Sequence, residues 1–145
     1  MIINYRLEKI AIEKKTRPKG PVEAKNSLRI TDIKEEPISS LTKDNALNMQ
    51  FSFAVTYEPN IALLEMVGSV TYLAEVKKAQ EILQNWKKNK KIKQEVAAPI
   101  FNFILAKCNI KALSLEQDVE LPYHLPIPRL KSKAEVTGKK PAKAS

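Results

Sequence analysis

The feature that most constrains this chain is a strict alternation of apolar and polar residues between Leu47 and Glu58. The apolar members occupy every second position, and they are Leu47, Met49, Phe51, Phe53, Val55 and Tyr57. A period of two sustained over a whole segment predicts a β-strand with one buried face. Residues 61–73 alternate again after a turn at residues 58–60, so we expect the two segments to pair as an antiparallel hairpin.

Two further strands are expected before this hairpin. Residues 2–13 alternate with a phase shift of one residue, which is typical of a strand that carries a β-bulge. Residues 28–33 predict a second, short strand. The segment between them, residues 14–27, contains Pro18, Gly20 and Pro21 and is expected to form a basic loop.

The apolar period changes to that of an amphipathic helix after Leu73. Residues 76–86 carry the stripe of a first helix, and Trp86 fits that stripe as a core residue better than as a base-stacking platform. A second helix is expected from about Gln94 to a point between Asn109 and Asp118. The order β-β-β-β-α-α predicts an α+β fold, with a four-stranded antiparallel β-sheet followed by two helices.

The C-terminal part of the chain has a different character. Residues 121–130 contain three prolines in seven residues, so they predict an extended Pro-rich arm. Its apolar side chains either lie along a groove of their own domain, which we favour, or bind a partner. Residues 131–145 form a basic tail that we expect to be disordered in isolation, which leaves residues 1–130 as a single domain.

The positive charge is concentrated in three segments. The chain has 25 Lys and Arg against 16 Asp and Glu, a net charge of +9. These segments hold the residues that we predict to contact RNA phosphates: Lys14, Lys15, Arg17 and Lys19; Lys87, Lys88, Lys90, Lys91 and Lys93; Arg129, Lys131, Lys133, Lys139, Lys140 and Lys143. Cationic segments on an otherwise mildly acidic body indicate a polyanionic partner.

Residue counts argue against several classes of chemistry. One His and one Cys cannot form a Ser-His-Asp or Cys-His arrangement with an orienting group, nor a zinc site. Three Gly leave no phosphate-binding glycine loop. We therefore expect a non-enzymatic protein with no catalytic residues, metal or cofactor. We find neither a signal peptide nor an apolar run long enough to span a membrane, so we expect no membrane insertion and a cytoplasmic location.

Part of the chain resembles a known family. Four segments carry the resemblance: residues 51–59 (FSFAVTYEP), 81–87 (EILQNWK), 107–113 (KCNIKAL) and 121–129 (LPYHLPIPR). They are similar to a family of small archaeal SecB-like proteins, and the order of elements is similar to that of the bacterial export chaperone SecB. The resemblance covers a little over half of the chain and implies a SecB-like fold, with binding of unfolded polypeptide as its activity.

Two functional hypotheses follow. The first is a ribosomal or ribosome-associated protein that binds ribosomal RNA and neighbouring ribosomal proteins, with an affinity that falls steeply with salt. The alternative is a SecB-like chaperone that binds unfolded polypeptide, for which Leu63 and Val67 would form an apolar patch on the second face of the sheet. The identity of the RNA, the oligomeric state and the sheet face that the helices cover are left open.

Overall fold

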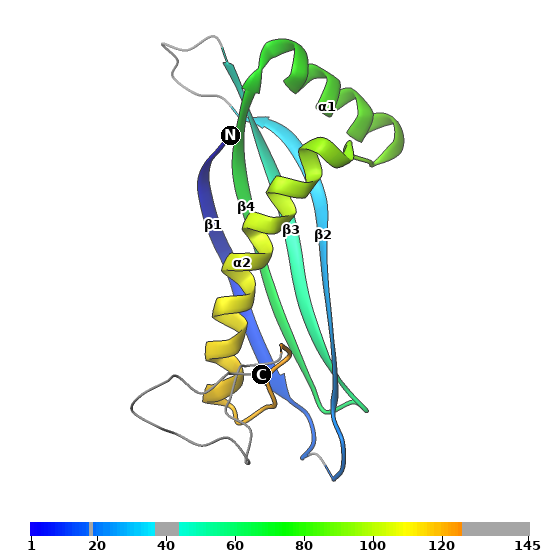
Figure 1. Cartoon of the computed structure of the whole chain (residues 1–145), viewed down its shortest axis with the longest axis vertical. Helices are drawn as coiled ribbons and strands as arrows, with labels where there is room; N and C mark the ends of the chain where they lie inside the picture. The colour runs from blue at the N-terminus through cyan, green and yellow to red at the C-terminus, as the bar shows by residue number, and fades with distance from the viewer. Residues whose placement is uncertain (18, 37–43, 126–145) are drawn as a thin grey trace, which may run out of the picture.

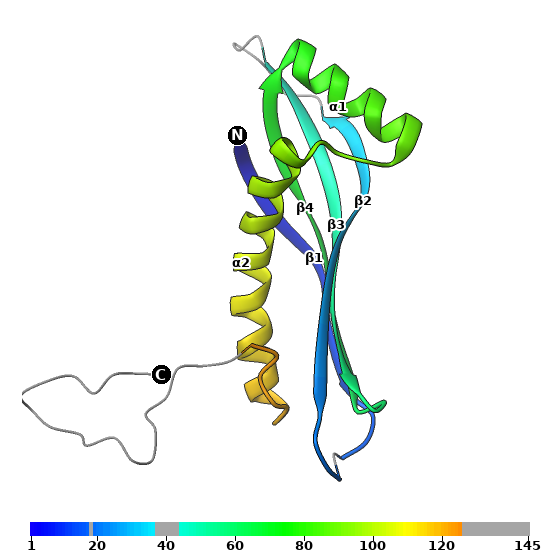
Figure 2. The same cartoon turned by 45° about the vertical axis from the view of Figure 1, so that its right-hand side comes forward.

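The computed structural model describes residues 1–17, 19–36 and 44–125, which form a long sheet with two helices on one face (Figure 1). The strands are β1 (Ile2–Lys14), β2 (Glu23–Glu36), β3 (Asp44–Glu58) and β4 (Ala62–Glu75). The helices α1 (Val76–Asn89) and α2 (Gln94–Asp118) follow. Figure 2 shows that α2 runs along the sheet while α1 lies across one end. The α+β fold with this order of elements is confirmed.

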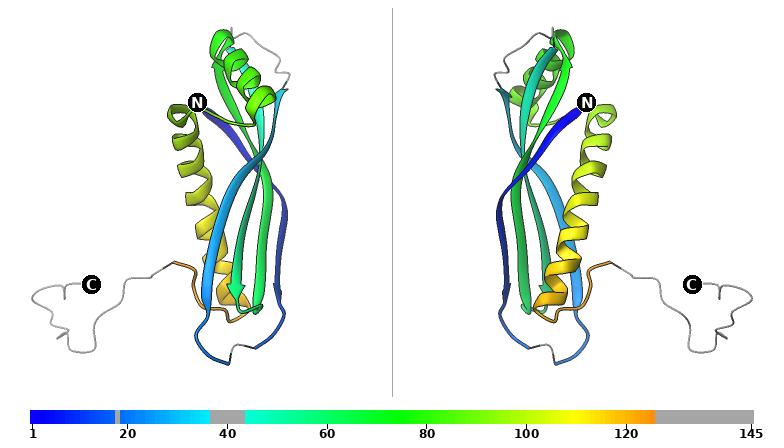
Figure 3. Two further views of the ribbon diagram at one scale, coloured as in Figure 1. Left: turned by 90° about the vertical axis from the view of Figure 1, so that its right-hand side faces the viewer. Right: turned by 90° about the vertical axis from the view of Figure 1, so that its left-hand side faces the viewer.

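The sheet is antiparallel throughout, with the strand order β1-β4-β3-β2. The predicted β3–β4 hairpin is present, and β1 carries the expected bulge, with register shifts between Ile2 and Asn4 and between Leu7 and Lys9. Because β1 and β2 are opposite edges, the chain between them must cross beneath the β3–β4 turn (Figure 3). The backbone N–H of Lys15 holds it there by donating to the carbonyl oxygen of this turn, 2.7 Å away.

Two of the predicted boundaries need correction. The basic loop expected over residues 14–27 is shorter, because β1 continues through Lys14 and β2 begins at Glu23. The alternation near Glu23 is weak in sequence, but pairing with the far end of β3, where Glu23 lies opposite Glu58, extends the strand. The Pro-rich arm is described only as far as Leu125, and residues 126–145, with the predicted basic tail, lie outside the described residues.

The core lies between the sheet and the helices. The six apolar residues of β3 that alternate from Leu47 to Tyr57 are each no more than 1% exposed. They pack beneath one stripe of α2 and three residues of α1: Val96, Ile100, Ile104, Cys108 and Ala112; Ala79, Ile82 and Trp86. The helices therefore cover the face of the sheet that carries the strong apolar phase of β3.

The second face of the sheet is polar. Leu63 and Val67 lie there, but they are half-buried, and the ion pair between Lys9 and Glu65 lies beside them. The apolar patch that the chaperone hypothesis placed on this face is therefore not formed by the described residues. Thr71, buried on the same face, donates to the Glu36 carboxylate at 2.8 Å.

The composition of α2 departs from the expectation that no segment is long and apolar enough to span a membrane. With 25 residues and a mean hydropathy of 1.3 in its most apolar stretch, α2 reaches that length and composition. The stripe from Val96 to Ala112 nevertheless packs on the sheet, and Glu116 is buried beneath the same helix. One face of α2 therefore belongs to the protein core.

Gly68 permits a close approach of β1 to β4 at the bulge. A Cβ atom at this position would lie 2.2 Å from the carbonyl oxygen of Arg6 and 3.0 Å from the ring of Phe51. The Phe51 ring covers the glycine and stacks on Tyr5 of β1 with ring centroids 5.9 Å apart. A side chain is excluded at Gly68 because the carbonyl oxygen of Arg6, which it would meet, belongs to the backbone.

Replacing Gly68 by Ala should therefore separate β1 from β4. We expect Gly68→Ala to lower the free energy of unfolding by about 1–3 kcal/mol, the usual range for overpacking a core. Gly20→Ala is the matched control, since nothing lies within 4 Å of a Cβ atom at Gly20. Urea denaturation measures both variants, and equal midpoints would contradict the assigned contact.

Candidate functional site

A groove opens between β2 and α2, because the helices cover only part of the sheet. α2 packs toward β1, where the ring of Tyr5 meets Phe103 edge-on at 5.9 Å between centroids and the Tyr5 hydroxyl lies 3.8 Å from Cys108 Sγ. On the other side, Leu28 and Ile30 of β2 face the helices but stay only half-buried. They form one wall of a groove of about 570 Å³, a volume typical of ligand-binding pockets.

The opposite wall is a second apolar stripe of α2. Ala97, Ala98, Phe101 and Leu105 line the groove, and all four are half-buried. Phe101 and Leu105 each follow by one residue a member of the sheet-facing stripe, which turns them about 100° around the helix axis. The helix therefore presents one apolar face to the sheet and another to the groove, which explains its high hydropathy.

Trp86 and Ile92 also line the groove, from the last turn of α1 and from the link between the helices. Trp86 is 6% exposed, so the prediction that it belongs to the core is confirmed. The Lys90 ammonium lies 5.3 Å from the centroid of its ring, within cation–π range. The indole Nε1 is buried and has no hydrogen-bond partner among the described residues.

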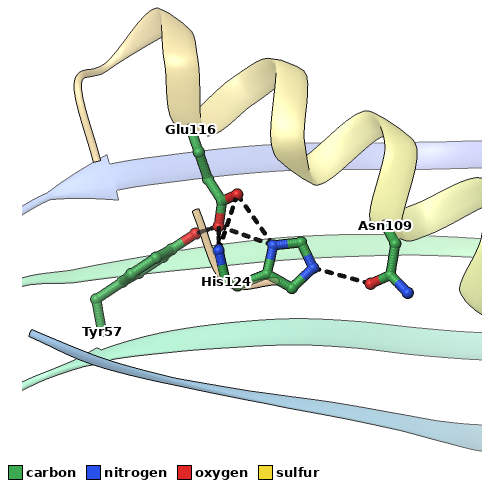
Figure 4. Close-up of polar contacts among 4 residues, drawn as sticks. All are labelled: Tyr57, Asn109, Glu116 and His124. Carbon is green, nitrogen blue, oxygen red and sulfur yellow. Dashed lines mark hydrogen bonds and ion pairs between the residues drawn. The ribbon is translucent and has the colours of Figure 1, made fainter. Parts of the chain in front are cut away.

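A buried polar network lies under the other half of α2, where the start of the Pro-rich arm folds back against the domain (Figure 4). Glu116 is fully buried and accepts hydrogen bonds from the Tyr57 hydroxyl of β3 and from His124 Nδ1 of the arm, at 2.9 Å for the latter. His124 Nε2 lies 2.9 Å from Oδ1 of Asn109, which also belongs to α2. The His124 ring also packs edge-on against Phe53 of β3.

The electrostatics of this network favour a protonated Tyr57. Burial raises the pKa of the Tyr57 hydroxyl far above its usual value, and the adjacent Glu116 carboxylate raises it further. The hydroxyl therefore stays a donor to Glu116 over the whole neutral range. A buried carboxylate with a phenol and an imidazole as partners is a satisfied arrangement, in which a charge that would be costly alone is compensated.

The network anchors the arm and is closed to solvent. The His124 side chain is 1% exposed, and none of Tyr57, Asn109, Glu116 and His124 lines the groove. The sequence predicted a packing or surface role for His124 but missed its partners. A signal was present, because Glu116 continues the four-residue spacing of the buried stripe from Val96 to Ala112. A carboxylate at a core position of a helix needs a buried partner.

The described residues show no metal site, since no three side chains of His, Cys, Asp or Glu converge among them. Cys108 is buried, and this burial raises the pKa of its thiol, partly offset by the hydrogen bond to Tyr5. The thiol form is therefore favoured, as the sequence predicts for an unreactive core cysteine.

The cations predicted to contact RNA do not form one surface. Lys14, at the end of β1, and the exposed Lys15, Arg17 and Lys19 lie at the end of the sheet opposite α1 (Figure 1). The second cluster surrounds the end of α1 and the link to α2: Lys87, Lys88, Lys90, Lys91 and Lys93. The third cluster lies outside the described residues: Arg129, Lys131, Lys133, Lys139, Lys140 and Lys143.

Local interactions account for part of the second cluster. Lys87 and Lys88 occupy the last turn of α1, where cations stabilise the negative end of the helix dipole. Lys93 forms an ion pair with Glu81, and this carboxylate raises the pKa of the Lys93 ammonium.

Comparison with known proteins identifies the type of fold. No protein-family model matches the chain. No curated protein matches it in sequence either. Among solved structures, the chain is similar to the Mycobacterium tuberculosis SecB-like chaperone Rv1957, solved in complex with a ChAD peptide from the antitoxin HigA1 (Rv1956). The two are 12% identical, the match covers 90% of each chain, and the TM-score is 0.51. The fold is therefore SecB-like.

This finding overturns the predicted ribosomal function. A solved structure that shares the fold is a chaperone bound to a peptide, and nothing in the comparisons connects the chain with ribosomal RNA or ribosomal proteins. The prediction of RNA binding rested on the density of basic residues in three segments, and no comparison supports it. The alternative of polypeptide binding is the better supported hypothesis.

Removing the carboxylate of the buried network should destabilise the fold. We expect Glu116→Ala to lower the free energy of unfolding by about 2–4 kcal/mol, because it leaves the Tyr57 hydroxyl and the His124 ring without their acceptor. Gln117→Ala changes the exposed neighbouring position and should lie within about 0.5 kcal/mol of the parent chain. Urea midpoints that are the same for both variants would show that the network contributes nothing.

The raised pKa of Tyr57 also predicts a loss of stability in alkali. The folded state holds the phenolic proton more tightly than the unfolded state, so this contribution is complete below about pH 10 and is lost as the pH rises above it. One such proton changes the free energy of unfolding by up to about 1.4 kcal/mol for each pH unit. Tyr57→Phe should flatten the decline between about pH 10 and 11.5.

Tyr123→Phe controls for the removal of a phenol as such, since Tyr123 is 45% exposed. This variant should keep the parental slope of stability against pH. If Tyr57→Phe and Tyr123→Phe gave the same slope of stability against pH, burial and the hydrogen bond to Glu116 would not be stabilising the protonated Tyr57 hydroxyl.

Proposed function

We propose that this chain binds extended segments of other polypeptides in the groove between β2 and α2, as a SecB-like chaperone. The observation that carries the proposal is the groove itself. Leu28 and Ile30 on the sheet face Phe101 and Leu105 on the helix, and all four remain half-buried in the folded chain. Apolar walls that the domain leaves partly uncovered gain free energy when a ligand buries them, at about 25 cal/mol for each Å².

The position of β2 suits an extended ligand. β2 is an edge strand of 14 residues, and its residues Leu28, Arg29 and Ile30 line the groove. An edge strand can pair with the backbone of an added strand, while alternate side chains of that strand enter a neighbouring pocket. A ligand bound in this way is recognised by its conformation and its apolar residues, with little dependence on exact sequence.

The peptide complex of the structural neighbour supports this proposal, because that chaperone with the same fold binds a polypeptide. We further propose that the chain acts by binding alone, without catalysis or a cofactor, and that it works in the cytoplasm. Membership of the small archaeal SecB-like family stays a prediction from the sequence segments that suggest it.

Blocking the groove should abolish binding and leave the fold intact. The ligand to use is a blocked peptide in which Leu and Ser alternate, and its binding can be followed through the fluorescence of Trp86, the one Trp of the chain. We expect Ala98→Phe to weaken binding at least tenfold, because the added ring fills the helix wall of the groove.

Ala106→Phe provides the matched control on the same helix. Ala106 is exposed and does not line the groove, so this variant should bind the peptide as the parent chain does. Circular dichroism should show both variants folded. Equal loss of affinity in the two variants, or no loss in either, would remove the groove as the binding site.

A further inference from the structure

The groove carries positive charge that its apolar function does not require. Two of its lining residues are cations: Lys90 at the end of α1, and Arg29 on the β2 edge, whose side chain alternates with Leu28 and Ile30 and therefore points toward the second face of the sheet. The remaining lining residues are apolar or are the neutral amides Gln94 and Asn102, and none is a carboxylate. An apolar groove with one cation inside it, Lys90, and another at its β2 edge, Arg29, complements a ligand that combines apolar and acidic side chains.

Acidic residues nearby do not cancel this charge. Three carboxylates line a neighbouring hollow between α1 and α2, and three lysines line the same hollow: Glu75, Glu81 and Glu95; Lys77, Lys78 and Lys93. That hollow is therefore balanced in charge. By contrast, the exposed Lys87, Lys88 and Lys91 lie in the turn and link that adjoin Lys90, and they add to the positive potential at the α1 end of the groove.

A lysine at position 90 is unfavourable for the local backbone conformation. Lys90 ends α1 in the left-handed region, with φ of 55°, and its N–H donates to the Trp86 carbonyl oxygen at 2.9 Å. Gly or Asn is preferred at such a helix end, because other residues are strained there. The lysine instead places its ammonium over Trp86 in the groove. A residue that is unfavourable for the fold but well placed at a site points to a role at that site.

We propose that the groove selects polypeptide segments in which apolar residues alternate with Asp or Glu, with Arg29 and Lys90 contacting the carboxylates. This inference rests on the proposed function and adds the class of ligand to it. In an extended segment, successive side chains point to opposite sides. In a segment beside β2, apolar side chains can then enter between Leu28 and Phe101, while the acidic ones that alternate with them point to the side of Arg29. An acidic side chain at the α1 end of the groove meets Lys90.

The chain's own C-terminal segment is a competing occupant, since the arm is anchored by His124 beneath α2. Its sequence argues against it. Beyond Leu125 it carries Arg129, Lys131 and Lys133, which have the same sign of charge as Arg29 and Lys90. Like charges brought together weaken binding, so the groove favours an acidic segment from another chain over this tail.

The test compares the affinities of four blocked peptides for the full chain by calorimetry. In the first three, Leu alternates with Ser, with Asp or with Lys, and the fourth has the sequence of residues 126–145. At low ionic strength we expect the Asp peptide to bind about five- to tenfold more tightly than the Ser peptide, and the Lys and tail peptides to bind more weakly than the Ser peptide. The difference between the Asp and Ser peptides should shrink at high salt.

Three variants test which cation causes the preference for the Asp peptide over the Ser peptide. Lys90→Asn and Arg29→Gln should each lower the affinity for the Asp peptide more than the affinity for the Ser peptide, so that the preference for the Asp peptide falls about two- to fourfold. Lys90→Asn should also keep or raise the melting temperature, because Asn suits the left-handed conformation. Lys15→Gln removes the same charge from the far end of the sheet and should leave the preference at its parental value.

The outcomes separate this inference from the proposed function. If the Ser and Asp peptides bound equally, or the Lys or tail peptide bound most tightly, the inferred ligand class would be wrong while polypeptide binding stood. If Lys15→Gln reduced the preference as much as Lys90→Asn, the charge at the groove would not be the cause. If no peptide bound, the proposed function itself would fail.

Discussion

The burial of one face of β3 is the interaction on which the rest of the structure depends. Six large side chains from Leu47 to Tyr57 point to that face, and none can be left in water without a large loss of stability. Their burial requires a cover, which α2 supplies along its stripe from Val96 to Ala112. A single helix is about 10 Å wide and spans about two strands at their spacing of 4.8 Å. A sheet of four strands is therefore only partly covered, and the groove beside β2 is the uncovered part.

The two halves of α2 serve different purposes because they meet different neighbours. Its N-terminal half faces the groove with Phe101 and Leu105, where apolar surface is left for a ligand. Its C-terminal half carries Asn109 and Glu116, which tie the start of the Pro-rich arm to the domain through His124. The buried carboxylate is tolerated because Tyr57 and His124 both reach it. One helix thus combines a closed polar anchor with an open apolar wall.

The distribution of charge explains why the sequence suggested nucleic acid. Lysines that are neighbours in sequence form dense blocks, but blocks such as Lys14–Lys19 and Lys87–Lys93 lie at opposite ends of the sheet (Figure 1). Several members have local partners, among them Lys93 with Glu81 and Lys90 with Trp86. The net charge of the chain indicates the sign of charge of a preferred ligand, and only the fold shows that Arg29 and Lys90 border the same groove.

The sequence by itself determined the elements of this protein. The period of two from Leu47 to Tyr57 and the helical period after Leu73 fixed the order of strands and helices, because burial on one side of a strand or helix leaves a local repeat. The hairpin of β3 and β4 followed from their adjacency. The tertiary structure alone decided that β1 lies beside β4, that Glu116 meets Tyr57 and His124, and that β2 and α2 form a groove. These contacts join segments distant in the chain, and a local apolar period records that a side chain is buried but not which partner buries it.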